Sequence, residues 1–322
     1  MPWLSSPFPP HHRTCRPAGE IIAPGTIAGI LDGDGSFFLA RRGDRYVPGI
    51  WLGMRDDDPL PFAVATSLAV RLGRPVGRMR HLEHRGRHGR NVFAVQAIDD
   101  LLAVTAFLAR YPVLSPKGAV RLAAVREATL RLADSRPGPG RPAPIADKVR
   151  LRALADALET GSLAPDSSAA RLGGHASDAY VADYFAGLVA AEGTFGIHSP
   201  GHSFRLTAAL GQRDWNRPVL DLLRERLGLG HVWSVGRRMD ALVIASAIDW
   251  AHLVELLRAH PIPSASPKAE QAALWIEAVG VRRALGPGAP DLAGLRARLM
   301  GLKAYRGPRL LCECPLDDGA GA

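Results

Sequence analysis

Two short segments of the chain share an acidic residue that follows a run of small and apolar side chains. The first, TIAGILDGDGSF, begins at Thr26 and contains Asp34; the second, YFAGLVAAEGTF, begins at Tyr184 and contains Glu192. Two carboxylates held close together repel each other unless a cation compensates them. Oxygen ligands of this kind suit Mg²⁺, which can activate water and stabilise a leaving oxygen. A fold that brings the two acids together would therefore make a site for hydrolysis at phosphate.

Each acid stands at the end of a predicted helix with one face of small residues. On the first predicted helix Gly25, Gly29 and Gly33 are four positions apart, and the second predicted helix has alanines at the same spacing. Residues four apart lie on one helix face, and glycine inside a helix is costly without a reason. Two such faces packed together would bring the backbones close. The predicted helix interface consists of Gly25, Ala28, Gly29, Ala186 and Gly187.

Further landmarks repeat in the same order, which indicates an internal duplication. The segment LGMRDDD at Leu52–Asp58 parallels LGQRDWN at Leu210–Asn216, with the spacing that separates Asp34 from Glu192. Ser-Pro-Lys also precedes an alanine-rich helical pattern in both halves. Such repeats indicate two copies of one structural unit.

Each half reads as a helix, two strands, a helix, two strands and two helices. Paired strands between helices favour an α+β fold with antiparallel sheets. We predict tandem pseudo-twofold αββαββαα repeats, with two saddle-like sheets around a central two-helix interface. The predicted divisions are a tail at 1–20, a first half at 21–133, a linker at 134–176, a second half at 177–286 and a tail at 287–322. The linker contains a predicted helix, Ile145–Glu159, that is either a connector or a small docking element.

The charge of the chain favours a polyanionic partner. The 322 residues carry a net charge of +9, almost all of it from arginine. Nucleic acid is the first expectation and an acidic membrane surface the second. The sequence contains neither an apolar run of membrane-spanning length nor a signal peptide, and its three cysteines do not form a disulfide framework. These features predict a soluble cytoplasmic protein.

The strings IAGILDGDG and FAGLVAAEG resemble the two copies of the signature that names the LAGLIDADG endonucleases. The resemblance covers both halves, and it implies that the motif helices form the central interface. It further implies that Asp34 and Glu192 bind Mg²⁺ or another divalent cation, with additional ligands from the backbone carbonyls of Gly33 and Ala191. A single chain with both halves is expected to act as a monomer.

The resemblance also implies residues that support the chemistry. The family places a lysine near each metal site, and Lys117 and Lys268 match that position. A glutamine often orients solvent at the end of the second strand, and Gln212 matches it. The first half departs from this pattern with Met54, which cannot hold a water as glutamine does. We therefore expect that one DNA strand is cut more slowly, or not at all.

By the same resemblance the sheets face double-stranded DNA. A two-stranded ribbon fits the major groove, and arginine suits guanine edges and phosphates. The residues predicted to bind DNA are Arg41, Arg42, Arg45, Arg78, Arg80, His84, Arg85, Arg87, Arg205, Arg213, Arg237 and Arg238.

The leading interpretation is a site-specific, metal-dependent endonuclease that reads a long asymmetric duplex. The alternative is a non-cleaving relative on the same scaffold, an RNA maturase or a transcription regulator. Both acids favour the enzyme, whereas Met54 slightly favours the alternative. An intein is disfavoured because the first residue is neither Cys nor Ser and no terminal His-Asn is present.

Overall fold

The computed structural model describes residues 20–82, 89–135, 145–163, 176–199, 201 and 203–303. The first half consists of α1 (Pro24–Gly33), β1 (Gly35–Arg42), β2 (Arg45–Arg55), α2 (Leu60–Leu72), β3 (Arg78–Leu82), β4 (Arg90–Val95), α3 (Ile98–Arg110) and α4 (Pro116–Asp134). The second consists of α7 (Asp178–Glu192), β5 (Gly193–His198), β6 (Arg205–Arg213), η2 (Asp214–Asn216), α8 (Arg217–Leu227), β7 (His231–Ser234), β8 (Met239–Ile244), α9 (Ala247–Ala259), α10 (Pro267–Leu285) and α11 (Asp291–Leu302). This order confirms the predicted α+β fold with two similar halves. None of the described helices has both the length and the apolar character needed to cross a membrane.

The two sheets have the same topology. Each has four antiparallel strands, in the order β1-β2-β4-β3 in the first half and β5-β6-β8-β7 in the second. Along β2, Ile50 and Leu52 are buried in the hydrophobic core, whereas Trp51 between them lies outside it. Along β6, Leu206 and Leu210 alternate with more accessible residues in the same way. Since successive strand residues point to opposite faces, each sheet has a core face packed on helices and an opposite face, here called the open face.

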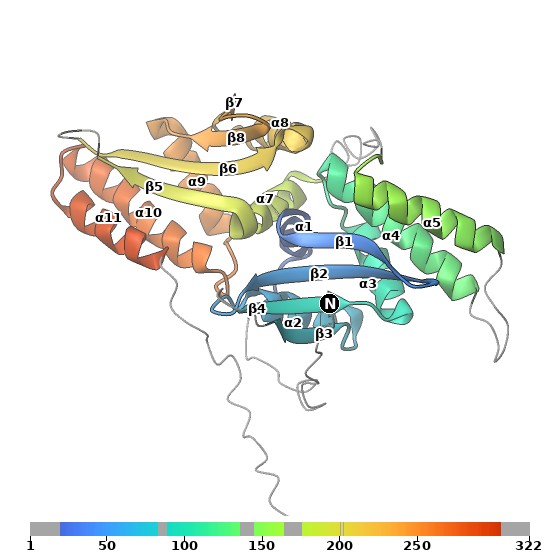
Figure 1. Ribbon diagram of the computed structural model, residues 1–322. Coiled ribbons are helices and arrows are strands. Elements are labelled where there is room, and N and C mark those ends of the chain that lie inside the picture. The colour runs from blue at the N-terminus through green and yellow to red at the C-terminus, as the bar shows by residue number, and fades with distance from the viewer. Residues whose placement is uncertain are drawn as a thin grey trace, which may run out of the picture.

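The helices α1 and α7 lie side by side between the two halves (Figure 1). A Cβ added to Gly29 would lie 2.9 Å from the backbone nitrogen of Leu188, and one on Gly187 would lie 3.0 Å from that of Ile30. These positions accept no side chain without separating the helices. The other predicted interface residues, Gly25, Ala28 and Ala186, are also buried.

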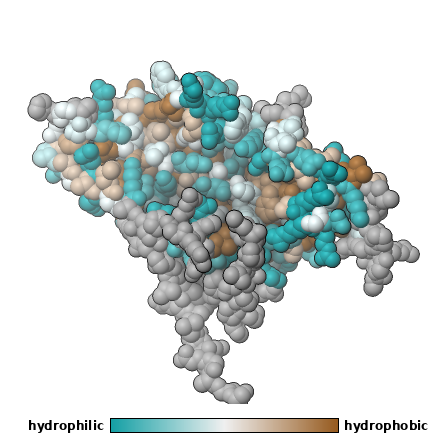
Figure 2. All heavy atoms as spheres, in the orientation of Figure 1, coloured by the Kyte–Doolittle hydropathy of each residue, from teal (hydrophilic) through white to brown (hydrophobic). Residues whose placement is uncertain are grey.

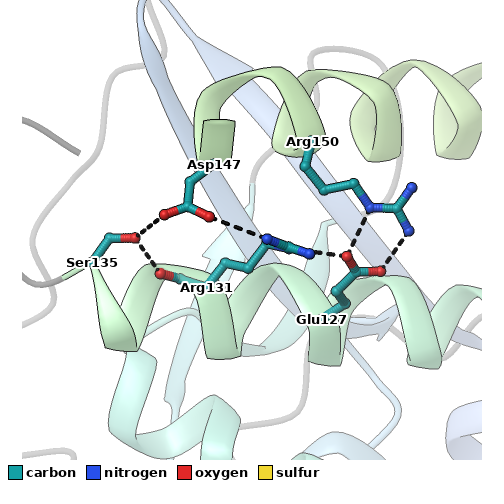
Figure 3. Close-up of polar contacts among 5 residues, drawn as sticks. All are labelled: Glu127, Arg131, Ser135, Asp147 and Arg150. Atoms are coloured by element: carbon teal, nitrogen blue, oxygen red, sulfur yellow. Dashed lines mark hydrogen bonds and ion pairs between the residues drawn. The ribbon is translucent and has the colours of Figure 1, made fainter. Parts of the chain in front are cut away.

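The predicted linker helix is α5 (Ile145–Thr160), and it docks on the first half. Its apolar side chains Leu151, Leu154 and Leu158 form a separate small core with Leu39 of β1 and Ala128 of α4. Polar contacts border this core (Figure 3): Glu127 receives two hydrogen bonds from Arg150, and Arg131 joins Glu127 to Asp147. Of the two roles left open by the sequence, docking is the one the structure supports.

The predicted C-terminal tail contains α11, so the prediction that the second half ends at residue 286 is wrong. Leu292, Leu295 and Leu299 are buried in the main hydrophobic core, where α11 packs on α10 and β5. Their spacing places them on one helix face. The apolar pattern was therefore visible in the sequence, and the second half extends at least to the end of this helix.

Candidate functional site

The two motif acids lie at the same end of the central helix pair. Asp34 caps the C-terminal end of α1, and its backbone N–H donates to the carbonyl oxygen of Ile30 at 3.0 Å. Glu192 is the last residue of α7. Between them, a Cβ added to Gly33 would lie 2.6 Å from the Cβ of Ala191 and 3.4 Å from the Cγ of Glu192. The small residues thus allow the helix ends to meet, and the two carboxyl groups become neighbours.

Burial disfavours the ionised form of both acids. Burial raises the pKa of Asp34 to about 7, and the charges of Glu192 and Asp58 act in the same direction, opposed by Lys268. Burial also raises the pKa of Glu192, again opposed by Lys268. Because each carboxylate is costly in its ionised form here, a cation placed between them would be favoured.

The acid pair adjoins a pocket of about 590 Å³ between the halves. Asp34, Met54, Asp58 and Arg90 line it from the first half. From the second half it is lined by Ala190, Ala191, Pro267, Lys268, Gln271, Leu302 and Lys303. One cavity therefore combines the end of the helix pair with basic residues from both copies of the repeat.

The two predicted lysines occupy different surroundings. Lys268 lies in the pocket, where burial and then Lys303 lower its pKa, while Asp34 and Glu192 raise it. Lys117 is exposed, and its ammonium lies 4.6 Å from the ring centroid of Trp215. A cation over an aromatic face is attracted to it. The structure therefore brings Lys268 to the acids, whereas Lys117 lies on Trp215.

Gln212 and Met54 occupy equivalent positions in the two halves, and the residues four positions later, Asn216 and Asp58, also differ. Gln212 is buried, and its side-chain oxygen accepts a hydrogen bond from the amide of Asn216 at 3.0 Å. In the first half the same two positions hold Met54 and Asp58, and both line the pocket. Asp58 also accepts a hydrogen bond from the backbone N–H of Leu60 at 3.0 Å, at the start of α2. The half without a glutamine therefore has a carboxylate near Asp34 instead.

Sequence reasoning missed the pocket residues Asp58 and Lys303. Asp58 had a signal, since it aligns with Asn216 in the duplicated segment. Lys303 had another, because lysine is rare in this chain; its ammonium donates a hydrogen bond to the carbonyl oxygen of Phe195 at 3.1 Å. Arg90 also lines the pocket, and its place there depends on the packing of the two halves.

The first acid of the first motif, Asp32, is partly buried and lies away from the pocket. Its carboxylate accepts hydrogen bonds from the backbone N–H of Ser115 at 2.8 Å and from the hydroxyl groups of Ser115 and Tyr184. Burial raises the pKa of Asp32, and these hydrogen bonds oppose the rise. The second motif has Ala190 at this position, and there Ser266 donates to the Ala190 carbonyl oxygen at 3.2 Å. Asp32 thus joins α1 to α7 and to the start of α4.

Most of the predicted DNA-binding arginines that the structure describes lie on the open faces or beside them. Arg42, Arg45, Arg78, Arg80, Arg205 and Arg213 occupy open-face positions of their strands, and Arg237 and Arg238 form the turn between β7 and β8. Arg41 does not share this face. It lies two residues after the buried Leu39, so its side chain points to the core face of the sheet. Its strand partner is Tyr46, which packs near α5. His84, Arg85 and Arg87 lie outside the described residues.

Comparison with known proteins identifies the fold. No protein-family profile and no curated protein sequence matches the chain. I-SmaMI bound to an uncleaved DNA target with calcium ions is similar, at 12% identity and a TM-score of 0.69 over 87% of this chain and 98% of that chain. The LAGLIDADG meganuclease I-AabMI, bound to uncleaved DNA, is 17% identical, with a TM-score of 0.68 over 88% and 100% of the two chains. I-GzeII in complex with its DNA target is 14% identical, with a TM-score of 0.66 over 86% and 97%. The chain therefore has the fold of the LAGLIDADG homing endonucleases, as its two motifs implied.

Proposed function

We propose that this chain is a metal-dependent endonuclease that hydrolyses phosphodiester bonds in a long asymmetric DNA duplex. One observation carries the proposal: Asp34 and Glu192 meet at the end of the helix pair, beside a pocket that contains Lys268. Both halves lie in one chain, so the proposed enzyme acts as a monomer.

The chemistry of the acid pair fits a magnesium ion. Among the described residues, no cluster of three or more His, Cys, Asp or Glu side chains could hold a metal alone. Mg²⁺ commonly takes one or two carboxylates and completes its shell with waters and substrate phosphates. Asp34 and Glu192 would hold it, with the backbone carbonyls of Gly33 and Ala191 as further candidate ligands. When bound, the ion would polarise a phosphate oxygen and lower the pKa of water.

The remaining pocket residues have separate roles in the proposed reaction. Lys268 would place a positive charge beside the phosphate as negative charge develops on its oxygens. Burial lowers the pKa of Lys268, and the two acids oppose this effect. In the first half Asp58 would accept a hydrogen bond from a water molecule near Asp34, the role that the resemblance gives to Gln212 in the second half.

The test is cleavage by wild-type protein and two acid variants. A library of duplexes is incubated with the protein and Mg²⁺, and the new DNA ends are sequenced. We expect defined cuts that disappear in Asp34→Asn and Glu192→Gln and persist in the matched controls Asp134→Asn and Glu225→Gln, whose side chains are exposed. Cuts that persist in both acid variants would refute the proposed mechanism.

The non-cleaving alternative has an observation in its favour, because Lys117 lies on Trp215 and the first half has Met54. The same experiment separates the two functions. Sequence-specific binding without any cut in Mg²⁺ or Mn²⁺ would support a regulator. Preference for structured RNA over duplex DNA would support a maturase.

A further inference from the structure

The strand registers assign each side chain of the sheets to one face, and they place a concentration of arginine on the open face of the first sheet. Six arginines stand at open-face positions of the described strands β1 to β4: Arg42, Arg45, Arg55, Arg78, Arg80 and Arg90. No acidic residue occupies this face within those strands. Arg55 pairs with Asp57, which lies just beyond β2, at 3.2 Å. Arg80 donates a hydrogen bond to the side-chain oxygen of Gln96 at 3.2 Å.

The open face of the second sheet has a different composition. Its strand arginines are Arg205 and Arg213, at the two ends of β6. The open-face residues between them on β6 are small: Thr207, Ala209 and Gly211. The adjoining strands add Thr194, Gly196 and His198 on β5, Met239, Ala241 and Val243 on β8, and His231 and Trp233 on β7. The middle strands of both open faces carry small and apolar residues. The two sheets differ most at the outer strand, where β3 carries Arg78 and Arg80 and β7 carries His231 and Trp233.

A large aromatic side chain stands beside this small-residue surface. Trp233 on β7 pairs with Ala241, which in turn pairs with Gly211 on β6. Trp233 is 60% exposed, and its ring meets that of His231 edge-on at 6.4 Å. An exposed tryptophan next to residues of minimal volume is available for contact with another molecule.

Arginine and apolar side chains read different bases in the major groove. Arginine pairs in a bidentate manner with the O6 and N7 acceptors of guanine, whereas apolar groups contact the methyl group of thymine. Arginine also binds phosphate, but such contacts add affinity and salt dependence without sequence information. The methyl groups of Ala209, Ala241 and Val243 have no hydrogen-bond donor for phosphate, so their place on the same face as Trp233 points to apolar contact with base edges.

We infer that the two halves read half-sites of opposite base composition. The first sheet reads a guanine-rich half of the duplex, and the second reads an A·T-rich half in which Trp233 contacts thymine methyl groups. This inference rests on the proposed function only in taking duplex DNA as the partner; it requires no cleavage.

The test is selection of bound DNA by the full chain. A library with a long randomised segment is incubated with the protein in Ca²⁺, and the bound duplexes are sequenced. The selection is repeated with Arg80→Ala, Trp233→Ala and the matched control Arg224→Ala, whose exposed arginine lies on α8, a helix that packs on the core face. Circular dichroism melting verifies that each variant folds.

The expected result is a consensus with one guanine-rich and one A·T-rich half. Arg80→Ala should relax guanine preference in the first of these by on the order of tenfold at one position. Trp233→Ala should relax thymine preference in the other half, and Arg224→Ala should change neither. Two halves of equal composition, or both variants acting on the same half, would overturn the inference while leaving the proposed function intact. Absence of any DNA binding would refute both.

Discussion

Lys268 of the second half and Asp34 of the first half interact electrostatically beside one pocket. Each lowers the energetic cost of the other's charge, because burial disfavours the ionised form of both. The catalytic pocket that we propose is therefore assembled across the two halves. Lys117, which aligns with Lys268 in the other half, lies over Trp215 instead.

This difference predicts unequal effects of removing the two lysines. Lys268→Ala should lower the cleavage rate by on the order of a hundredfold or more, as the loss of one preorganised charge-stabilising group does. Lys117→Ala should lower it much less, because its ammonium is held 4.6 Å from the Trp215 ring centroid. A supercoiled plasmid carrying the selected target measures nicking and linearisation separately, and Lys148→Ala on α5 is the control. Equal losses in Lys268→Ala and Lys117→Ala would contradict the asymmetry.

The raised pKa of Asp34 predicts that metal affinity depends on pH. Burial, the charge of Glu192 and the charge of Asp58 bring the pKa to about 7. Below that pH the metal must displace a proton, so the Ca²⁺ affinity at pH 6 should be about tenfold weaker than at pH 8. Titration calorimetry measures this affinity without cleavage. An affinity that does not change between these pH values would rule out the proposed coupling.

The raised pKa of Asp34 also predicts that the metal-free protein becomes less stable as the pH rises. Between pH 3.8, the ordinary pKa, and about 7, the folded protein keeps a proton on Asp34 that the unfolded chain has lost. The contribution of Asp34 to stability is therefore complete at low pH and is lost as pH rises through 7. Asp34→Asn should remove this loss, so the variant should melt at a higher temperature than the wild type at pH 8 without metal. The difference should disappear near pH 4.

The sequence was sufficient to predict the fold because the signals that define it are local and occur twice. Three local signals each identify one helix or strand: the acid-glycine helix ends, the LGMRDDD and LGQRDWN strands, and the Ser-Pro-Lys helix starts. Because each signal occurs twice in the same order, the repetition identifies the order of these elements in both halves. The position of Arg41 was also predictable, since it has the same parity as the buried Phe37 and Leu39. The alternation of the strand, rather than the presence of charge, determines which face an arginine takes.

The parts that sequence could not give depend on contacts between elements from different halves. Lys117 meets Trp215 only because the start of α4 lies near η2, and Tyr184 reaches Asp32 across the helix interface. Side chains far apart in sequence decide both positions. No motif at Lys117 or Asp32 contains that information.

The close approach of α1 and α7 predicts that Gly29 cannot be replaced. A methyl group at Gly29 would meet backbone atoms of α7, including the nitrogen of Leu188 at 2.9 Å. Gly29→Ala should therefore lower the free energy of unfolding by about 2–3 kcal/mol, despite the better helix propensity of alanine. Gly280→Ala is the matched control, because its added Cβ would meet open space within α10, and it should gain about 0.5–1 kcal/mol. Urea denaturation of both variants measures these changes; a stabilised Gly29→Ala would contradict the packing.

The docking of α5 predicts that its apolar contacts matter more than its ion pairs. Leu154 is 4% exposed within the small core, so Leu154→Ala should cost about 2–5 kcal/mol in the stability of that contact. Glu127→Gln should cost about 0.2–1 kcal/mol at neutral pH, since the side chains of this network are partly exposed to solvent. Hydrogen exchange of the α5 amides measures the effect of each substitution on the docking of the helix. Greater exchange in Glu127→Gln than in Leu154→Ala would show that the ion pairs contribute more than the apolar contacts.

The contribution of the ion pairs should itself depend on pH. Hydrogen bonds from Arg150, together with those from Arg131, hold the pKa of Glu127 at about 2, against an ordinary value of 4.5. A lowered pKa stabilises the folded state above the unfolded pKa, and the benefit is lost as the pH falls from 4.5 toward 2. Exchange in α5, corrected for the intrinsic effect of pH, should therefore increase over this range in the wild type and much less in Glu127→Gln. An identical pH response in the two proteins would show that the network does not hold the helix.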